Sequence, residues 1–304
     1  MKPLVSDQIK HHSTTVKTQT RALSPVTSPN ILTRFIRAIG ERLYLVRASI
    51  IYNFQIETAY FADLWTNMIS TLFYIIATIL FVDILYANVD FIASYSRAEM
   101  LLYIFIGQVG YYTLWGTSYS AIDALINDVR KGDLDLVLLK PLPALFYLET
   151  RKIHLIRTFR DAIVPTLVLI TVVPWSELSF DPISVITGFC IIVIGLFCLH
   201  IYMLLFSLPV FWIGESQNLF GLAWTIYTFT DGRIPYEGFG STLKVIFSVG
   251  LPLLWTTGVS TSVILGKSDA LTMLLAGTAV LIMFIMIRSW AWKKAMLAYS
   301  SASS

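Results

Sequence analysis

The sequence contains little charge for its length. Asp, Glu, Lys and Arg make up 13% of the 304 residues, 56% are hydrophobic, and the mean hydropathy is +0.70. Soluble domains carry about 25% charged residues, so this chain cannot cover a water-exposed surface in the usual way. A disordered chain, a coiled coil and an ordinary cytosolic enzyme are therefore disfavoured. The composition predicts an integral membrane protein, whose main solvent is lipid.

Cysteine is also scarce, and catalytic signatures are missing. Cys190 and Cys198 are the only cysteines, and on a helix eight residues span about 12 Å, which is too far for a disulfide. There is no HExxH, GxSxG or CxxC motif, and the four histidines share no metal-ligand spacing. His200 lies in an apolar run, which is more typical of a core histidine with satisfied hydrogen bonds, or of a pore-lining histidine, than of a metal ligand. We therefore expect no catalytic residue, metal, cofactor or nucleic-acid partner.

Long runs without charge predict an all-α fold with six transmembrane helices, since a helix needs about 20 apolar residues to cross a bilayer. One more apolar run, 245–265, precedes the last span, and hydropathy alone does not decide whether it crosses the membrane or is re-entrant. The six predicted spans are residues 66–87, 99–120, 161–177, 183–214, 218–231 and 270–288.

The distribution of Lys and Arg favours the re-entrant alternative. Cytoplasmic loops are enriched in these residues. With six spans, both termini are cytoplasmic, and all but four of the 22 basic residues (Arg97, Arg233, Lys244 and Lys267) lie on the inner side. A seventh span would place the C-terminal basic cluster outside. We therefore expect a multi-pass protein of the cell inner (plasma) membrane, with a re-entrant outer element before the last span.

The N-terminal 65 residues divide into two parts. Residues 1–30 are rich in Ser and Thr and contain one acid, which predicts a disordered cytoplasmic tail; a transit peptide is the alternative. From residue 31 to 50, apolar residues recur every three or four positions with arginines between them. This pattern predicts an amphipathic helix in the cytoplasmic headgroup layer, although such a helix can also pack on protein.

The loop 121–160 has its own structure. It begins with AIDALINDVRK, in which Ile122, Leu125 and Val129 share one helical face. Gly132 is the expected C-cap, and a polar turn and a Pro-x-Pro sequence follow. A cytoplasmic loop of this kind presents a shaped surface to a soluble partner; the alternative is a helix that only lies on the membrane.

A few intramembrane residues are candidates for either a transport pathway or packing. Asp83 is the clearest charge inside a span, where charges are costly. Gly107 and Gly110 permit close approach of helices, and Tyr111 and Trp115 lie on the same predicted span. The scarcity of buried carboxylates argues against a proton-driven carrier.

The loop motif resembles the ABC-2 type permease family (type-2 ABC exporters), and within it the multidrug/antibiotic-exporter-like subfamily. That subfamily has an I-x-x-G-x-L-D-x-x-L-L-x-P-L loop after the second span, and the similarity extends over about residues 34–304. Val129 stands at the first position, and Gly132, Leu134, Asp135, Leu138, Leu139, Pro141 and Leu142 match the rest; Pro235, Phe239, Pro252, Leu265 and Gly266 fit a later family motif, and Tyr299-Ser300-Ser301-Ala302 fits its closing sequence.

The resemblance implies six transmembrane helices, an interfacial N-terminal helix, a cytoplasmic coupling helix and a re-entrant pair, with 31–304 as the permease domain. It also implies a dimer, with the same or a related permease, that works with separate ABC ATPase subunits. The candidates for ATPase contact are Arg130, Gly132, Asp133, Asp135, Lys140 and Pro141, with Ile122, Leu125 and Val129 seating the helix.

The expected function is therefore the non-enzymatic membrane subunit of an exporter for amphipathic or lipid-like substrates. Gly266-Lys267-Ser268 imitates the end of a phosphate-binding loop, but Thr261 replaces its first glycine and a hydrophobic helix end precedes it. ATP hydrolysis is thus expected on the partner. An ion-gradient-driven secondary transporter and a non-transporting membrane scaffold are the alternatives.

Overall fold

The computed structural model describes residues 31–58, 61–230 and 233–299. Within these ranges every regular element is a helix, and a single isolated β-bridge joins Ile92 and Tyr95. The all-α prediction is confirmed for this part of the chain. The predicted disordered tail, residues 1–30, lies outside the described residues.

The chain divides into two compact units, residues 1–41 and 42–304. In the first unit, Arg37 and Glu41 form an exposed ion pair on consecutive turns of α1, with 3.1 Å between Nε and Oε1. All other elements belong to the second unit. The longer helices are α1 (Ile31–Thr58), α2 (Phe61–Tyr86), α3 (Arg97–Leu114), α4 (Ser120–Lys131), α7 (Leu155–Val172), α8 (Pro182–Ser207), α10 (Gln217–Thr230) and α13 (Ala270–Ala298).

Short helical elements connect them. Before α7 in the chain, these are the π-helical turn η1 (Trp115–Tyr119) and the helices α5 (Leu134–Leu138) and α6 (Ala144–Thr150). The remaining ones are η2 (Trp175–Glu177), α9 (Val210–Ile213), η3 (Tyr236–Gly238), α11 (Ser241–Val245), η4 (Ile246–Gly250), η5 (Trp255–Val259) and α12 (Ser260–Ile264).

Three helical segments among the described residues are long and apolar enough to cross a membrane: Thr66–Tyr86, Pro182–Ile213 and Ala270–Ala298. A fourth element is a pair of helices, Ser241–Gly250 and Trp255–Ile264, bent by 109°. The other predicted spans coincide with α3, α7 and α10, which have 18, 18 and 14 residues. Helices thus occupy all six predicted positions, and six complete crossings stay a prediction.

The second predicted span and the predicted coupling helix form one continuous helix, where a loop was expected to begin. α3 starts with a capping box, in which Ser96 and Glu99 satisfy each other's backbone N–H groups. The π-helical turn η1 carries the helix into α4 without a break, because the residues at both junctions keep right-handed helical angles. Gly132 ends it at φ +78°, so the predicted C-cap is confirmed.

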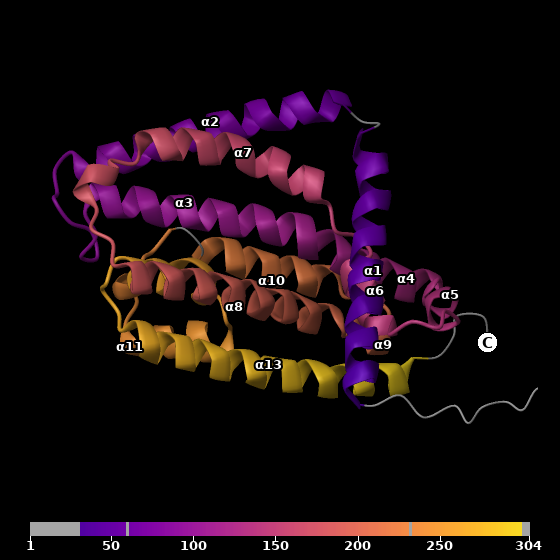
Figure 1. The fold of residues 1–304 in the computed structure, drawn as a ribbon. Coiled ribbons are helices and arrows are strands. Elements are labelled where there is room, and N and C mark those ends of the chain that lie inside the picture. Colours follow the sequence, from indigo (N-terminus) through magenta and orange to yellow (C-terminus); the bar gives the residue numbers. More distant parts are fainter. Residues whose placement is uncertain (1–30, 59–60, 231–232, 300–304) are drawn as a thin grey trace, which may run out of the picture. The chain divides into compact units, whose positions relative to one another are not determined.

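Helix α8 lies at the centre of the larger core of the second unit. It packs against α13, α12, η5 and α10, while α3, α7 and α2 pack on one another (Figure 1). Gly195 lets the bent pair approach α8, because a Cβ there would lie 2.5 Å from the backbone N of Thr256. Both cysteines are free, with Cys190 exposed and Cys198 buried.

The outward faces of the long helices are apolar. Phe73 and Ile84 on α2, Ile186 on α8 and Leu271 on α13 are each at least 65% exposed. Soluble proteins rarely expose such extensive apolar surface. These faces suit a lipid environment.

Candidate coupling surface

Helix α4 is held in place by its apolar face. Ile122 and Leu125 are each 1% exposed, and Val129 is half-buried against the same core. The helix packs on α6, α8 and α9. This is the arrangement expected for three residues that seat the helix, and it leaves the polar face of α4 for other contacts.

The tip after α4 presents apolar side chains to the surface. The left-handed backbone of Gly132 turns the chain into the short helix α5. Leu136 and Leu139 are 64% and 81% exposed, beside the exposed Asp133 and Pro141. Exposed leucines at the end of a polar loop mark a contact surface. Sequence reasoning missed Leu136, because periodicity does not reveal the exposed face of so short a helix.

Two of the predicted ATPase-contact residues are bound within the chain itself. Arg130 forms an ion pair with Glu215, 3.1 Å between Nη1 and Oε2. Lys140 donates a hydrogen bond of 3.1 Å to the Tyr147 hydroxyl and lies over its ring. These contacts tie the tip to the segment before α10 and to α6. Gly132, Asp133 and Pro141 therefore remain better placed for a partner than Arg130 or Lys140.

The polar face of α4 is anchored at two further points. Asp128 forms an ion pair with Arg151, 2.5 Å between Oδ2 and Nη2, and each side chain is 15% exposed. Burial raises the pKa of Asp128 above its ordinary value and outweighs the opposite effect of Arg151. Asp123 accepts a hydrogen bond of 2.7 Å from Gln217. α4 is thereby joined to both α10 and the α6–α7 connection.

Asp135 connects the tip to the end of α13. Burial, together with a hydrogen bond and the charge of half-buried Asp135, raises the pKa of Tyr299 to about 12. Tyr299 also packs against Phe211 of α9, with ring centroids 5.9 Å apart. Asp135 of the loop motif thus has a contact inside the chain.

A buried ionic cluster joins the loop 121–160 to the long helices, and sequence reasoning missed it. Glu149 of α6 is 9% exposed and accepts hydrogen bonds from Arg288 of α13, one of them 2.8 Å from Nε, the other from Nη2. His200 Nε2 of α8 lies 3.5 Å from the same carboxylate, and His200 Nδ1 lies 2.9 Å from Ser118 Oγ. The cluster joins α6, α8, α13 and η1.

The charge state of this cluster follows from its contacts. Burial alone would raise the pKa of Glu149, but the hydrogen bonds from His200 and Arg288 and their charges outweigh it, so the pKa lies below its ordinary value. Glu149 is therefore ionised at neutral pH. The isolated His200 was the one signal in the sequence, and its partners, Glu149 and Ser118, are 51 and 82 positions away along the chain.

Three of the intramembrane candidates, Asp83, Gly107 and Gly110, have roles in the packing of neighbouring helices. Asp83 Oδ1 accepts from Arg97 Nε at 2.7 Å, which favours an interhelical role over substrate contact. Gly107 is buried in α3, and a Cβ at Gly110 would lie 2.8 Å from Thr256 Cγ2, so Gly110 admits the bent pair.

Tyr111 and Trp115 belong to an aromatic cluster between the α3–η1 helix and α10. The Tyr111 and Trp224 ring centroids lie 5.4 Å apart, and those of Trp115 and Trp224 lie 5.2 Å apart. Trp115 also stacks on Tyr119 at 4.3 Å. These half-buried rings are compatible with packing and with a pathway wall.

No group of three or more His, Cys, Asp or Glu side chains arranged to hold a metal ion occurs among the described residues.

Comparison with known proteins gives one match. A family model described as ABC-2 family transporter protein matches residues 72–303. No curated protein and no solved structure matches the chain. The matched range contains most of α2, the coupling surface, the aromatic cluster, the bent pair and α13.

Proposed function

The chain belongs to the ABC-2 transporter family, and from this membership we propose that it is the permease subunit of an ATP-binding-cassette exporter. The family match and the apolar helices together indicate a multi-pass membrane protein with a transport role. In the proposal, ATP is hydrolysed on separate ATPase subunits, and the substrate moves outward through a permease dimer.

The continuity of α3, η1 and α4 carries this proposal. A partner that pushes on α4 and α5 would move residues 97–131 as one body, because no loop absorbs the displacement. Glu149 and His200 would transmit the same motion to α13 and α8. A cytoplasmic surface connected in this way to the interior of the bundle is what an ATP-driven permease requires.

The proposed topology has six spans, α2, α3, α7, α8, α10 and α13, with both termini cytoplasmic. The bent pair supports the proposed re-entrant outer element, since two helices that meet at 109° within Ser241–Ile264 do not form one straight crossing. An even number of crossings then keeps Arg288, Lys293 and Lys294 on the inner side, in line with the positive-inside rule.

The proposed substrate is amphipathic or lipid-like, and its path would follow the aromatic cluster around Tyr111, Trp115 and Trp224. These rings lie between two helices and are half-buried in the single chain, so a second permease subunit would complete the wall. The second subunit is an identical or a related chain.

The experiment compares the permease–ATPase complex with Gly132→Pro and Asp135→Lys variants. Proline cannot adopt φ +78°, so Gly132→Pro should redirect the tip and reduce ATPase co-purification and substrate-stimulated ATP hydrolysis at least about tenfold. The matched control is Gly221→Ala, since nothing lies within 4 Å of its added Cβ. Unchanged assembly and coupling, or ion-gradient-driven transport without an ATPase, would overturn the proposal.

A further inference from the structure

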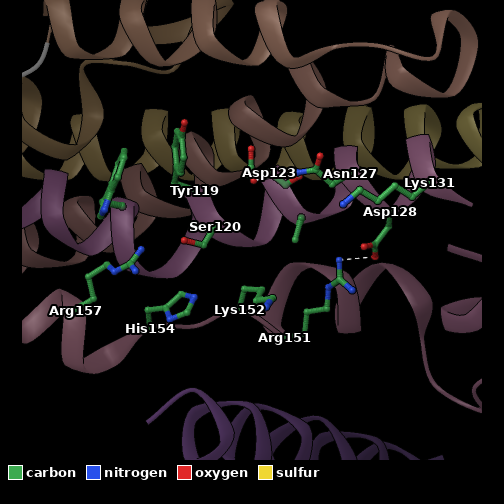
Figure 2. Close-up of a pocket in the computed structure, with 12 residues that line it drawn as sticks. Tyr119, Ser120, Asp123, Asn127, Asp128, Lys131, Arg151, Lys152, His154 and Arg157 are labelled. Atoms are coloured by element: carbon green, nitrogen blue, oxygen red, sulfur yellow. Dashed lines mark hydrogen bonds and ion pairs between the residues drawn. The ribbon is translucent and has the colours of Figure 1, made fainter. Parts of the chain in front are cut away.

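A cavity of about 640 Å³ lies between α4 and the connection from α6 to α7. Figure 2 shows Ser120 and Asp128 of α4 on the side of the helix that faces His154, Lys152 and Arg151, with the Asp128–Arg151 ion pair across the space between them. This volume is within the range of small-molecule sites, about 300–1,000 Å³. The lining residues are Trp115, Tyr119, Ser120, Asp123, Ala124, Asn127, Asp128, Lys131, Arg151, Lys152, His154 and Arg157.

The cavity has an excess of positive charge. Lys131, Arg151, Lys152 and Arg157 line it, against two carboxylates. Both carboxylates have partners in the wall or next to it: Asp128 pairs with Arg151, and Asp123 accepts from Asn127 at 3.2 Å and from Gln217 at 2.7 Å. Asp128 and Arg151 neutralise each other, so the positive charge that suits the cavity to an anion comes mainly from Lys131 and Lys152.

The backbone adds to this preference. α7 has 18 residues and begins at Leu155, and the side chain of its N-cap residue, His154, makes no capping hydrogen bond. His154 and Arg157, which flank this start, both line the cavity. The N-terminus of a helix carries a partial positive charge and unpaired N–H donors, which favour phosphate and other anions.

One wall of the cavity is aromatic. Trp115 and Tyr119 stack with ring centroids 4.3 Å apart and an interplanar angle of 22°. Both side chains combine an apolar ring with a polar group, a combination enriched at membrane–water interfaces. The cavity therefore has a cationic part and an amphipathic part next to each other, as a lipid headgroup and its glycerol require.

We propose that this cavity binds the phosphate group of an anionic phospholipid from the cytoplasmic leaflet. Lys131 and Lys152 contact the phosphate, the start of α7 donates to it, and the Trp115–Tyr119 stack contacts the glycerol and the first acyl carbons. Basic pockets on the cytoplasmic side of membrane helices hold such headgroups. Placing the cavity on this side rests on the proposed function and its topology.

A lipid in this position would bridge α4 and α7. Lys131 is the last residue of α4, and Lys152 lies three positions before α7 begins at Leu155. The bound phosphate would thus hold the coupling helix against the third predicted span, and the surrounding lipid composition would affect the coupling surface.

The experiment measures binding of fluorescently labelled phosphatidylglycerol to the full chain purified in detergent, without any ATPase. The variant is Lys131→Gln with Lys152→Gln. The control is Lys293→Gln with Lys294→Gln, which removes the same charge from exposed positions of α13 outside the cavity. We expect the first variant to weaken binding at least about tenfold, since each lysine near an anionic headgroup contributes about 1 kcal/mol. The control should change binding less than about twofold.

Competitors distinguish the two sources of phosphate. Unlabelled phosphatidylglycerol should displace the probe from the wild type, whereas phosphatidylcholine and inorganic phosphate should not. Displacement by inorganic phosphate at millimolar concentration would assign the cavity to a free phosphoanion and overturn the lipid assignment. Equal binding by the wild type and the first variant, or equal losses in both variants, would overturn the site itself.

A charge-conserving variant guards against misfolding. Lys131→Arg with Lys152→Arg should retain binding within about threefold, because the cationic charge is kept. Loss of binding in this variant, with an unchanged elution profile, would contradict the charge-based argument. Because no ATPase is present, a negative result here leaves the proposed permease function standing, and failed ATPase coupling leaves the lipid site standing.

Discussion

The end of the helix bundle that carries the candidate coupling surface and the bent pair are held in place by different chemistry. At the coupling end, charged groups join the elements: Glu149 with Arg288, Asp128 with Arg151, and Arg130 with Glu215. In the second helix of the bent pair, Trp255–Ile264, the polar side chains that are at most 1% exposed all carry hydroxyls, namely Thr256, Thr257, Ser260, Thr261 and Ser262.

The difference concerns how easily each end can change its contacts. Ser260 Oγ donates to the Thr256 carbonyl of its own helical segment, and close packing at Gly195 fixes that segment on α8. Such contacts allow few alternative arrangements. At the coupling end, the exposed Arg130–Glu215 pair can exchange with water, salt or a partner, whereas the Glu149–Arg288 pair is buried. We therefore expect a rigid bent pair and, at the coupling end, a surface whose exposed contacts can change around a buried ion pair.

The largest effect is expected for Glu149→Ala. Removing one partner of a buried pair leaves Arg288 uncompensated and should lower the free energy of unfolding by about 3–5 kcal/mol. Thermal unfolding in detergent measures the loss. The double variant Glu149→Met with Arg288→Met should recover most of it, since no unpaired charge remains. An equal loss in the double variant would show that packing, and not charge, holds this end.

A smaller effect is expected for Gly195→Ala, at the contact between α8 and the bent pair. The added Cβ would lie 2.5 Å from the Thr256 backbone N, so the bent pair must shift away from α8. Overpacking of this kind costs about 1–3 kcal/mol of unfolding free energy. Gly221→Ala is the control, with open space around its Cβ. Equal losses of unfolding free energy for Gly195→Ala and Gly221→Ala would show that the bent pair is not packed rigidly on α8.

The stability that Glu149 contributes should also depend on pH. The pKa of Glu149 is lowered in the folded chain, so its contribution is complete above the unfolded value, 4.5, and is lost as pH falls through the folded value. Below pH 4.5 the wild type should therefore lose stability more steeply than Glu149→Gln. The difference in unfolding midpoint between the two chains, measured from pH 7 to pH 3, should narrow. A constant difference would contradict the assignment of an ionised Glu149.

The smallest effect is expected for Arg130→Ala. The Arg130 and Glu215 side chains are 45% and 44% exposed. Exposed pairs of this kind contribute about 0–1 kcal/mol. The same unfolding assay should show a change within that range, and one that disappears in high salt. A salt-independent loss above 2 kcal/mol would mean that Arg130 is structural and not part of an adjustable surface.

The fold was predictable wherever short-range pattern decides it. Charge-free runs located the helices, Gly132 marked the end of α4, and the charge distribution favoured a re-entrant segment where the structure has a bent pair. The π-helical turn at Trp115–Tyr119 escaped prediction because no local sequence pattern distinguishes a π-helical turn from the α-helix around it. No local signal separates a continuous helix from a span followed by a loop.

The candidate site was predictable in part. The apolar positions Ile122 and Leu125 followed from helical spacing, because one face must be buried. Glu149 and Arg288 are 139 positions apart, and only the packing of α6 on the bundle brings them together. The exposure of Leu139 also depends on the tertiary turn after Gly132. Contacts between distant segments thus account for what sequence reasoning missed.

The central claim is that the α4–α5 tip is the surface that meets the ATPase. Photo-crosslinking tests it most directly, with p-benzoylphenylalanine introduced at Leu139, 81% exposed on the tip, or at Val245, 62% exposed on the bent pair. In membranes containing the ATPase subunit, the account predicts a crosslink to that subunit from position 139 and none from position 245. A crosslink from position 245, or none from position 139 in an assembled complex, would contradict it.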